Sequence, residues 1–463
     1  MADQYDVVVL GAGPGGYVAA IRAAQLGLKT AVVEKQYWGG ICLNIGCIPT
    51  KALLHNAEVV HTLKNDAKEL GFSFDNLKLD YGVAFKRSRQ VSDRLVKGIG
   101  FLMRKNKIDT VDGVGKLTDK NTIQVTLNSG GEQTLSAKNI IIATGARPRP
   151  FPGVEFDDDR IISYVPAILA DSLPKSVVII GGGAIGMEFA YTWVNYGVDV
   201  TILEMMPHLL PNEDPEVCDV IEKAYKKLGV NFHTNAKVTG IDKTKSGVKI
   251  SLEDGQTFEA DKVMVAINFI PNVDDIGLEA AGVELTERKN IKIDGSMRTN
   301  VPNIYAIGDV ATDYRLAHVA SAMGLVAAEV IAGHPTVELD FRMMPRCTYC
   351  VPQVASFGYT EAQAKEAGYE INVGQFPFVA NGKALGLGER EGFIKIVADA
   401  RYGEILGAHM VGPGVTELLP ELTLAHNNEL TAEEIARNVH AHPTLSEGLM
   451  EAAHGVEGET IHI

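Results

Sequence analysis

The chain has 463 residues, of which 46% are hydrophobic, so it is long enough to form roughly three domains with sizeable cores. Its 58 acidic side chains outnumber 43 basic ones and leave a net charge of -15, which argues against a nucleic-acid partner. Five cysteines are too few for a secreted disulfide scaffold, and neither a signal peptide nor a bilayer-spanning apolar stretch is evident, so we expect a soluble cytoplasmic enzyme without a membrane partner.

A nucleotide-binding pattern occupies the N-terminal part of the chain. The β-branched apolar run at 6–10 predicts a strand, and a glycine turn, a helix and a second strand ending in Glu34 follow it. Gly11 permits the turn, Gly13 lets the backbone approach a pyrophosphate, and Gly16 allows the helix and strand to pack closely. The N–H groups of the helix start bind phosphate, and the terminal acid can accept hydrogen bonds from both ribose hydroxyls. Glycines alone also serve ordinary turns, but these elements in this order predict a dinucleotide-binding unit.

Two cysteines follow, Cys42 and Cys47, with four residues between them. A helix is predicted from Pro49 to about Leu63, so Cys47 is expected at the positive end of a helix dipole, which favours a thiolate. The pair can meet disulfide geometry if the backbone bends at Gly46. A redox-active pair is therefore predicted. The alternatives are two buried structural cysteines or half of a metal site, although zinc spacing is normally tighter and no matching second pair exists.

A boundary between domains is expected near residue 148. The run 140–142 predicts a strand that ends on the small-residue turn Ala143-Thr144-Gly145, and three prolines follow within a few residues.

The nucleotide-binding pattern then recurs. An apolar run at 176–180 leads into a turn with Gly181, Gly183 and Gly186, and the next strand ends in Glu204. In both copies the acid lies 23 residues after the first glycine. Two such Rossmann units predict two nucleotide-containing cofactors, one of them a nicotinamide. Because Glu204 repels a ribose 2′-phosphate and no arginine follows it closely, NAD is favoured over NADP.

Further strands are expected at 248–252 and 263–267, which would complete the second unit. Another strand, 304–307, ends at Gly308 and Asp309. Asp309 could receive a hydroxylated cofactor tail, or it could be a solvated loop acid, and position alone does not decide between these.

The pattern changes after Pro345, where short strands precede three helices in an α+β arrangement without a nucleotide fingerprint. The expected strands are 354–357, 372–378, 393–398 and 405–411. Capping boxes are predicted for Thr431 with Glu434 and for Thr444 with Glu447. Such a domain could close an active site or form a subunit interface.

Two features of this region allow more than one interpretation. Cys347 and Cys350 have the spacing of a redox or zinc pair, but a strand is expected from Val351 and no further ligands complete a metal site, so a structural role is favoured. His442 and Glu447 could form a base and its orienting partner. Locally, a loop histidine beside a capping glutamate is the slightly better interpretation.

Taken together, these residues resemble the flavin-dependent disulfide oxidoreductases over essentially the whole chain. The most specific elements are the two glycine fingerprints and the segments Gly39–Lys51, 143–145, 308–309 and 440–447. The resemblance implies an α/β fold with two Rossmann-like nucleotide-binding domains and a C-terminal α+β dimerisation domain. The implied limits are 1–148 for FAD binding, 149–272 for NAD binding, 273–343 for a central segment completing the FAD region, and 344–463 for the interface.

The resemblance also implies roles for individual residues. His442 and Glu447 become catalytic beside Cys42 and Cys47, and Lys51 with Glu188 matches an ion pair next to the flavin. FAD contacts are expected at Gly11, Gly13, Gly16, Glu34, Lys51, Gly115, Thr144, Gly145, Asp309 and Ala317. NAD contacts are expected at Gly181, Gly183, Gly186, Glu204, Val238 and Asn268, and no metal site is predicted.

The implied reaction is oxidation of protein-bound dihydrolipoamide to lipoamide, with the electrons passing through FAD to NAD. The base His442 would deprotonate the substrate, whose thiolate attacks Cys42 while Cys47 faces the flavin. The implied partners are a second copy of the chain, and lipoyl domains and the acyltransferase core of a 2-oxoacid dehydrogenase complex. A glutathione- or mercuric-reductase-like enzyme and a non-catalytic flavin-binding assembly protein remain alternatives.

One departure from the family pattern concerns the NAD pocket. The family usually has glycine at the position of Asn268, and polar residues where this chain has Phe269 and Ile270. Asparagine tolerates a positive φ better than most residues, so the turn is expected to survive with an added side chain.

Overall fold

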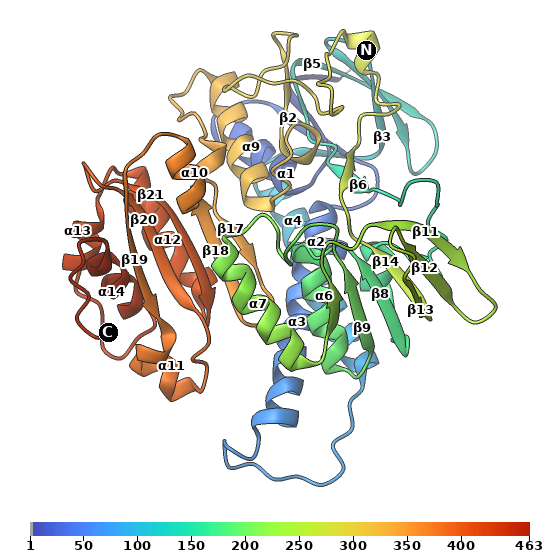
Figure 1. Ribbon diagram of the computed structural model, residues 1–463. Coiled ribbons are helices and arrows are strands. Elements are labelled where there is room, and N and C mark those ends of the chain that lie inside the picture. The colour runs from blue at the N-terminus through green and yellow to red at the C-terminus, as the bar shows by residue number, and fades with distance from the viewer. Residues whose placement is uncertain (1–2) are drawn as a thin grey trace.

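The computed structural model describes residues 3–463 and contains three regions, each organised around its own main β-sheet (Figure 1). The first carries the long N-terminal helices, the second follows it in the chain, and the third is the antiparallel C-terminal sheet on the left of the view. This arrangement confirms the predicted fold class.

The first region is a parallel sheet in the order β3-β2-β1-β5-β16, with β4 pairing antiparallel to the far ends of β3 and β5. Its strands are β1 (Asp3–Leu10), β2 (Thr30–Glu34), β3 (Asp109–Asp119), β4 (Thr122–Leu127), β5 (Glu132–Ile142) and β16 (Ile304–Ala306). Two helices, α1 (Pro14–Gln25) and α9 (Ala317–Ala332), pack against each other so closely that a β-carbon on Gly15 would lie 2.9 Å from the carbonyl oxygen of Ala320. The turn η2 (Gly308–Val310) precedes α9.

A helical hairpin of this region extends from the centre of Figure 1 to the bottom, where its tip lies. It consists of α2 (Gly40–Ile45), α3 (Cys47–His61) with its π-helical continuation η1 (Thr62–Asp66), and the long α4 (Tyr81–Lys105). The start of α3 is two residues earlier than predicted and its α-helical part ends two residues earlier, because the last turn widens into η1.

The second region repeats the parallel architecture in the order β10-β9-β8-β14-β7. Its strands are β7 (Ile161–Ile162), β8 (Ser176–Ile180), β9 (Asp199–Leu203), β10 (Asn231–His233) and β14 (Lys262–Val265), with helices α5 (Tyr164–Leu169), α6 (Ala184–Asn195) and α7 (Pro215–Leu228). An antiparallel sheet of β11 (Val238–Lys243), β12 (Val248–Leu252) and β13 (Thr257–Ala260) packs beside it. The strand predicted at 263–267 ends two residues early, at Val265.

A two-stranded ladder lies where the chain crosses between these regions. It pairs β6 (Ala146–Pro148) with β15 (Phe269–Pro271), and the short helix α8 (Leu278–Ala281) follows. The chain thus leaves the first region and returns to it through neighbouring strands.

The third region is an antiparallel sheet in the order β17-β18-β21-β20-β19. Its strands are β17 (Arg346–Thr348), β18 (Gln353–Gly358), β19 (Ile371–Pro377), β20 (Phe393–Asp399) and β21 (Ile405–Gly412). Its helices are α10 (Glu361–Glu366), α11 (Gly382–Leu387), α12 (Val415–Asn427), α13 (Ala432–Arg437) and α14 (Glu447–Val456), with short turns η3 (Phe341–Met343) and η4 (Phe378–Ala380). Three helices follow the last strand, as predicted.

Local predictions in this region fare differently. The capping box of Thr431 and Glu434 is present. The box predicted for Thr444 and Glu447 is wrong, because α14 begins at Glu447 itself and no side chain caps it. The strand expected from Val351 begins only at Gln353, because the chain bends at residues 350–352. Within residues 3–463, no helix combines the length and the apolar character that crossing a membrane requires.

Candidate active site

The two predicted redox cysteines lie on consecutive helices and are joined by a disulfide. Cys42 belongs to α2, Cys47 is the first residue of α3, and their Cα atoms are 4.6 Å apart. The bend occurs at Gly46, as predicted, and a β-carbon there would lie 3.0 Å from the carbonyl oxygen of Ile41. Since α3 starts at Cys47 and no side chain caps it, the positive end of the helix dipole faces this sulfur.

One turn further along α3, Lys51 meets side chains from both other regions. Its Nζ lies 2.9 and 2.8 Å from the two carboxylate oxygens of Glu188 on α6. The same carboxylate accepts the backbone N–H of Tyr349 at 3.1 Å, and the ammonium of Lys51 lies 4.5 Å from the centre of the Tyr349 ring. The predicted ion pair is therefore formed. Sequence reasoning missed Tyr349, for which no local pattern gives a signal.

The acids Glu34 and Glu204 have equivalent surroundings in the two copies of the nucleotide-binding unit. Glu34 accepts the N–H of Ala12 in the glycine turn at 2.8 Å, and Glu204 accepts that of Gly182 at 2.7 Å. The other oxygen of Glu204 accepts the N–H of Met206 at 2.8 Å. Each carboxylate thus fixes its glycine turn and keeps lone pairs for a ribose.

The glycines of the turns show why side chains are excluded there. Gly11 has a φ of 106°, and a β-carbon on it would lie 2.3 Å from the carbonyl oxygen of Ala143. A β-carbon on Gly16 would lie 1.9 Å from the oxygen of Gly11. Gly13 differs, because its β-carbon would meet no atom closer than 3.9 Å. Space therefore exists in front of the uncapped start of α1, where a pyrophosphate can accept the free N–H groups.

The second turn repeats these relations. Gly181 has a φ of 108°, and its β-carbon would lie 2.5 Å from the oxygen of Ala266. The corresponding distance from Gly186 to the oxygen of Gly181 is 2.1 Å. Nothing lies within 4 Å of a β-carbon on Gly183, and α6 also lacks a side-chain cap.

Other residues expected to contact FAD surround the first sheet. Gly115 is packed in β3, where a β-carbon would lie 2.5 Å from a methyl group of Leu10, so a larger residue would displace the Leu10 side chain. The hydroxyl of Thr144 donates to the carbonyl of Asn272 at 2.8 Å, and the carbonyl of Gly145 accepts the Asn272 N–H at 2.9 Å. Thr144 and Gly145 thus hold the strand that returns to the first region.

Asp309 and Ala317 lie at the starts of two helical elements in this region. Burial raises the pKa of Asp309 to about 6, although the nearby charge of Arg315 opposes the shift. Ala317 is the first residue of α9, which has no side-chain cap. A partly buried acid without a hydrogen bond from another described residue, next to a free helix start, fits a ligand with hydroxyl and polar groups such as FAD.

Two residues predicted for the NAD pocket lie in the second region. Val238 begins β11 and pairs with Leu252. Asn268 does not have a positive φ, so the tolerance argued from the sequence is not needed. Its side-chain oxygen instead accepts the N–H of Phe269 at 2.7 Å and a guanidinium N–H of Arg315 at 2.7 Å.

The predicted base and its partner are in contact. Nδ1 of His442 lies 2.9 Å from one carboxylate oxygen of Glu447, whose other oxygen accepts the Thr444 N–H at 2.8 Å. Burial alone would raise the pKa of Glu447, but the hydrogen bonds from Thr444 and His442 hold it below its usual value. The imidazole itself is 79% exposed, so its second nitrogen is open to a substrate or another chain.

Within one chain, this pair does not face the disulfide. Glu447 begins α14, which lies at the outer left of Figure 1, whereas α2 lies at the centre, with the C-terminal sheet between them. The structure therefore brings together Cys42 with Cys47, Lys51 with Glu188, and His442 with Glu447. Within one chain, it does not bring the histidine pair to the cysteine pair.

Two further cysteines and one cluster of ionisable side chains lie outside these contacts. Cys347 and Cys350 are free; burial raises their pKa values to about 11 and about 12. His208, Asp219 and Glu222 have ligand atoms within 4.8 Å of one another, a grouping that sequence spacing did not predict. Exposed carboxylates commonly gather in this way without a metal ion.

Comparison with known proteins decides the family. Residues 5–324 match the family model described as pyridine nucleotide-disulphide oxidoreductase, and residues 344–453 match its dimerisation domain. The chain belongs to the pyridine nucleotide-disulphide oxidoreductase family. Dihydrolipoyl dehydrogenase of Mycobacterium leprae is 56% identical, with 99% of both chains covered. The enzyme of the same name from Corynebacterium glutamicum is 54% identical over the whole of both chains.

Solved structures of this family agree with the fold. LpdA from Mycobacterium tuberculosis has a TM-score of 0.91 at 27% identity, covering 98% of this chain and 99% of its own. The HOCl-induced flavoprotein disulfide reductase RclA from Escherichia coli has a TM-score of 0.85 at 26% identity, covering 96% and 98%. The predicted cofactors, FAD and NAD, are those of the family, and the two open glycine turns fit them.

Proposed function

We propose that the chain oxidises protein-bound dihydrolipoamide to lipoamide and transfers the two electrons to NAD. The disulfide between Cys42 and Cys47 at the start of α3 carries this proposal, because it is the group that a dithiol can reduce. The full-length identity to dihydrolipoyl dehydrogenases, 56% for the Mycobacterium leprae enzyme, supports the choice of dithiol.

The chain's own residues account for the exchange steps. His442, oriented by Glu447, takes the proton from one substrate thiol, and the resulting thiolate attacks the sulfur of Cys42. The bond between Cys42 and Cys47 breaks, and Cys47 leaves as a thiolate that the α3 dipole stabilises. The second substrate thiol, once deprotonated, attacks the substrate sulfur of the mixed disulfide. Lipoamide departs with a new ring disulfide, and both enzyme sulfurs are reduced.

The cofactors complete the reaction. Bound FAD supplies a two-electron carrier between the reduced cysteine pair and NAD. Lys51, held by Glu188, places a positive charge one turn beyond Cys47. Glu204 would accept the ribose hydroxyls of NAD, and the start of α6 at Gly183 would bind its phosphates. The other residues predicted from the sequence to contact FAD or NAD are proposed to do so here as well.

We propose further that the active site is shared between two chains. The separation of α14 from α2 within one chain supports this, as does the match of residues 344–453 to a dimerisation domain. We also propose that the chain divides into four functional parts, with boundaries after residues 148, 272 and 343. The limits of the β-sheets support this division. The lipoyl group would come from the lipoyl domains of a 2-oxoacid dehydrogenase complex. The chain would also bind the acyltransferase core of that complex.

A substrate panel tests the reaction. The purified protein is assayed with dihydrolipoamide and NAD, and separately with glutathione disulfide and NADPH. We expect NADH formation in the first assay and no NADPH consumption in the second. The reverse result would favour a glutathione-reductase-like enzyme, and a flavin-containing protein inactive in both would favour a non-catalytic role.

A heterodimer tests the shared site. Subunits carrying Cys47→Ser and His442→Ala are combined, which places both defects in one shared site and leaves the other intact. About half of the wild-type turnover per dimer is expected, because a two-fold interface creates two equivalent sites. Activity no higher than that of either parent variant would mean that each site lies within one chain.

A further inference from the structure

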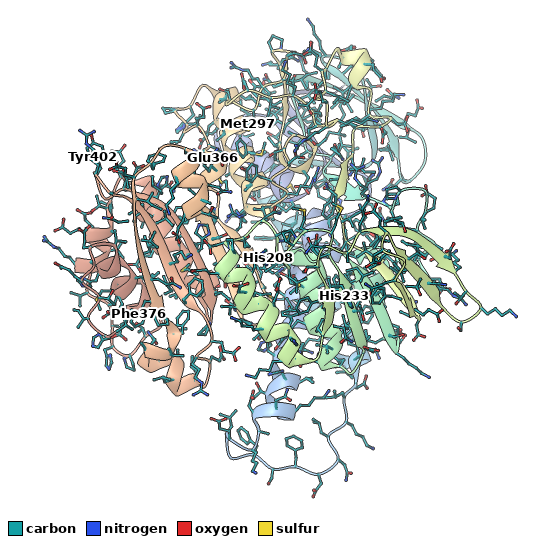
Figure 2. The ribbon with its side chains drawn as sticks, viewed as in Figure 1. His208, His233, Met297, Glu366, Phe376 and Tyr402 are labelled. Atoms are coloured by element: carbon teal, nitrogen blue, oxygen red, sulfur yellow. A yellow bond between two sulfur atoms is a disulfide. The ribbon has the colours of Figure 1, made fainter. Side chains whose placement is uncertain are left out.

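A cavity of about 800 Å³ lies where the three regions meet, and three arginines, Arg315 among them, line it. Its wall includes Gly183 and Ala184 at the uncapped start of α6. Glu366, labelled in Figure 2, lines it from α10 in the C-terminal region. Because free N–H groups at a helix start bind anions, the phosphates of the dinucleotide belong in this cavity.

Arg315 is held more firmly than a surface arginine. Its side chain is 14% exposed, and its guanidinium donates to Asn268 at 2.7 Å and to Asp313 at 3.3 Å. The guanidinium carbon lies 5.8 Å from the centre of the Phe269 ring. Its Nε is buried and has no hydrogen-bond partner among the described residues. A buried N–H without an acceptor is unfavourable, so a ligand that supplies one is stabilised.

The internal repeat locates Asn268 in the dinucleotide site. In the first unit a β-carbon on Gly11 would meet the oxygen of Ala143, and in the second a β-carbon on Gly181 would meet that of Ala266, at 2.3 and 2.5 Å. Asn268 follows two residues after Ala266, just beyond the end of β14. It therefore lies at the carboxyl edge of the parallel sheet, the edge at which such folds bind their ligands.

The strand order assigns Asn268 to one half of that ligand. β8 lies between β9 and β14, so Glu204 at the end of β9 and Asn268 after β14 lie on opposite sides of the glycine turn. A dinucleotide spans the crevice across such a turn. If Glu204 takes the adenosine ribose, the side with Asn268 and Arg315 takes the nicotinamide half.

The charge of Arg315 is not cancelled by its acidic neighbour. Asp313 is shared with Arg288, whose guanidinium nitrogen lies 2.7 Å from the other carboxylate oxygen. Asp313 therefore does not fully neutralise Arg315, and Asp309, on whose pKa the Arg315 charge acts, is a second acid within its range.

We propose that Arg315, held in place by Asn268, is a specificity-determining residue of the nicotinamide half-site and favours NADH over NAD. The ring of oxidised NAD is a cation and that of NADH is neutral, while the phosphates are the same. A fixed positive charge beside this half is therefore more favourable for NADH. The inference rests on the proposed function. With Arg315 in the pocket, the product NADH competes with NAD more strongly than it would in a neutral pocket.

Binding to the oxidised holoenzyme tests this inference without turnover. The ligands are NAD, 1,4,5,6-tetrahydro-NAD as a neutral-ring analogue that transfers no hydride, and AMP as the adenosine half alone. Titration calorimetry gives Kd for each. For Arg315→Leu we expect Kd of the neutral analogue to rise about tenfold and that of NAD by less than about threefold, with AMP unchanged.

Further variants separate charge, position and structure. Arg315→Lys keeps the charge and should retain the wild-type ratio of the two Kd values within about twofold. Asn268→Gly should shift the ratio of the two Kd values in the same direction as Arg315→Leu. The variant that carries both substitutions should show the same ratio as Arg315→Leu alone. Arg342→Leu is the matched control, because this arginine lines the same cavity but is exposed and stacks on Tyr359; its ratio should not change.

The inference is overturned if Arg315→Leu weakens both dinucleotides equally or leaves both unchanged. If that variant does not fold, an unchanged ratio in Asn268→Gly overturns it instead. Turnover of dihydrolipoamide by the wild-type protein tests the proposed function separately, since NAD binding needs no dithiol.

Discussion

Cys47 and the two free thiols Cys347 and Cys350 differ in what surrounds each sulfur. Cys47 begins a helix of 15 residues, whose aligned peptide dipoles favour the thiolate. Burial raises the pKa of Cys347 to about 11 and that of Cys350 to about 12. Only the first environment suits a sulfur that must leave and attack as a thiolate at neutral pH.

Serine substitutions should therefore separate the pairs. We expect Cys42→Ser and Cys47→Ser each to abolish dihydrolipoamide turnover, because either change removes the reducible bond. The double variant Cys347→Ser and Cys350→Ser should keep its activity and its metal content. Stoichiometric zinc that is present in the wild type and lost in this double variant would contradict a structural role for the second pair.

Alkylation of the reduced protein gives a pH-dependent check. At pH 8, iodoacetamide should label Cys42 and Cys47 first, as read by mass spectrometry. A thiol with a raised pKa forms its reactive thiolate only as the pH rises. The alkylation rates of Cys347 and Cys350 should therefore increase about tenfold per pH unit, up to their pKa values of about 11 and 12. Rapid labelling of Cys350 at pH 8 would show that its sulfur is not buried.

Glu204 is expected to set the choice between NAD and NADP. Glu204→Ala removes the acceptor for the ribose hydroxyls and the charge that repels a 2′-phosphate. Charge-assisted hydrogen bonds contribute about 1.5–3 kcal/mol, so the preference for NAD should fall at least about tenfold. The ratio of kcat/KM values measures it. Glu34→Ala is the control, because it changes the other copy of the unit and should leave this ratio as it is.

Among the elements, the glycine turns contain positions that no side chain can occupy without a shift of the backbone. A β-carbon on Gly16 would lie 1.9 Å from the oxygen of Gly11, which is backbone and cannot move aside. We expect Gly16→Ala to reduce the flavin content of the purified protein severely and to lower its Tm. Gly98→Ala, inside α4 with nothing within 4 Å, should instead be neutral or stabilise by about 0.5–1 kcal/mol. Retained flavin in Gly16→Ala would contradict the packing argument.

Elements whose signal is local could be predicted from the sequence. Strand, glycine turn, helix and acid occupy neighbouring positions, so both Rossmann units, with Glu34 and Glu204, follow from short-range pattern. The box predicted at Thr444 fails for a local reason: Glu447 accepts the Thr444 N–H, but the Thr444 hydroxyl donates to the carbonyl of Ala441, and α14 begins only at Glu447. No sequence expectation covered α4, whose position depends on packing against α3.

Contacts across long sequence separations could not be predicted from pattern. Lys51 and Glu188 are 137 residues apart, and only the family resemblance suggested their pairing. Tyr349 had no signal, because it contacts Glu188 through its backbone N–H, which every residue except proline possesses. Arg315 had none either, since its role depends on Asn268 in another region.

At the scale of the whole molecule, a buried lysine joins the second and third regions. Lys395 on β20 has a side chain that is 2% exposed and lies 3.1 Å from Asp214, the N-cap of α7. It also contacts Glu216 at 2.7 Å and Glu361 at 3.1 Å. Removing one partner of a buried ion pair leaves an uncompensated charge, which is strongly destabilising.

Lys395→Met should therefore lower the free energy of unfolding by about 3–5 kcal/mol, as measured by urea denaturation with tryptophan fluorescence. Lys227→Met is the matched control, because Lys227 joins the same two regions through Glu391 at 2.9 Å, with side chains that are 78% and 52% exposed. It should change stability by less than about 1 kcal/mol. Equal effects of the two substitutions would mean that burial of Lys395 is not what matters.

The carboxylates of Glu34 and Glu204 have a consequence for molecular recognition. Because each already binds the backbone of its glycine turn, both pockets have a fixed shape before a ligand arrives. A receptor of fixed shape orders few of its own groups on binding, so the entropy lost comes mainly from the ligand. Rigid competitors that present a vicinal diol at the correct spacing should consequently outperform flexible ones of equal contact area.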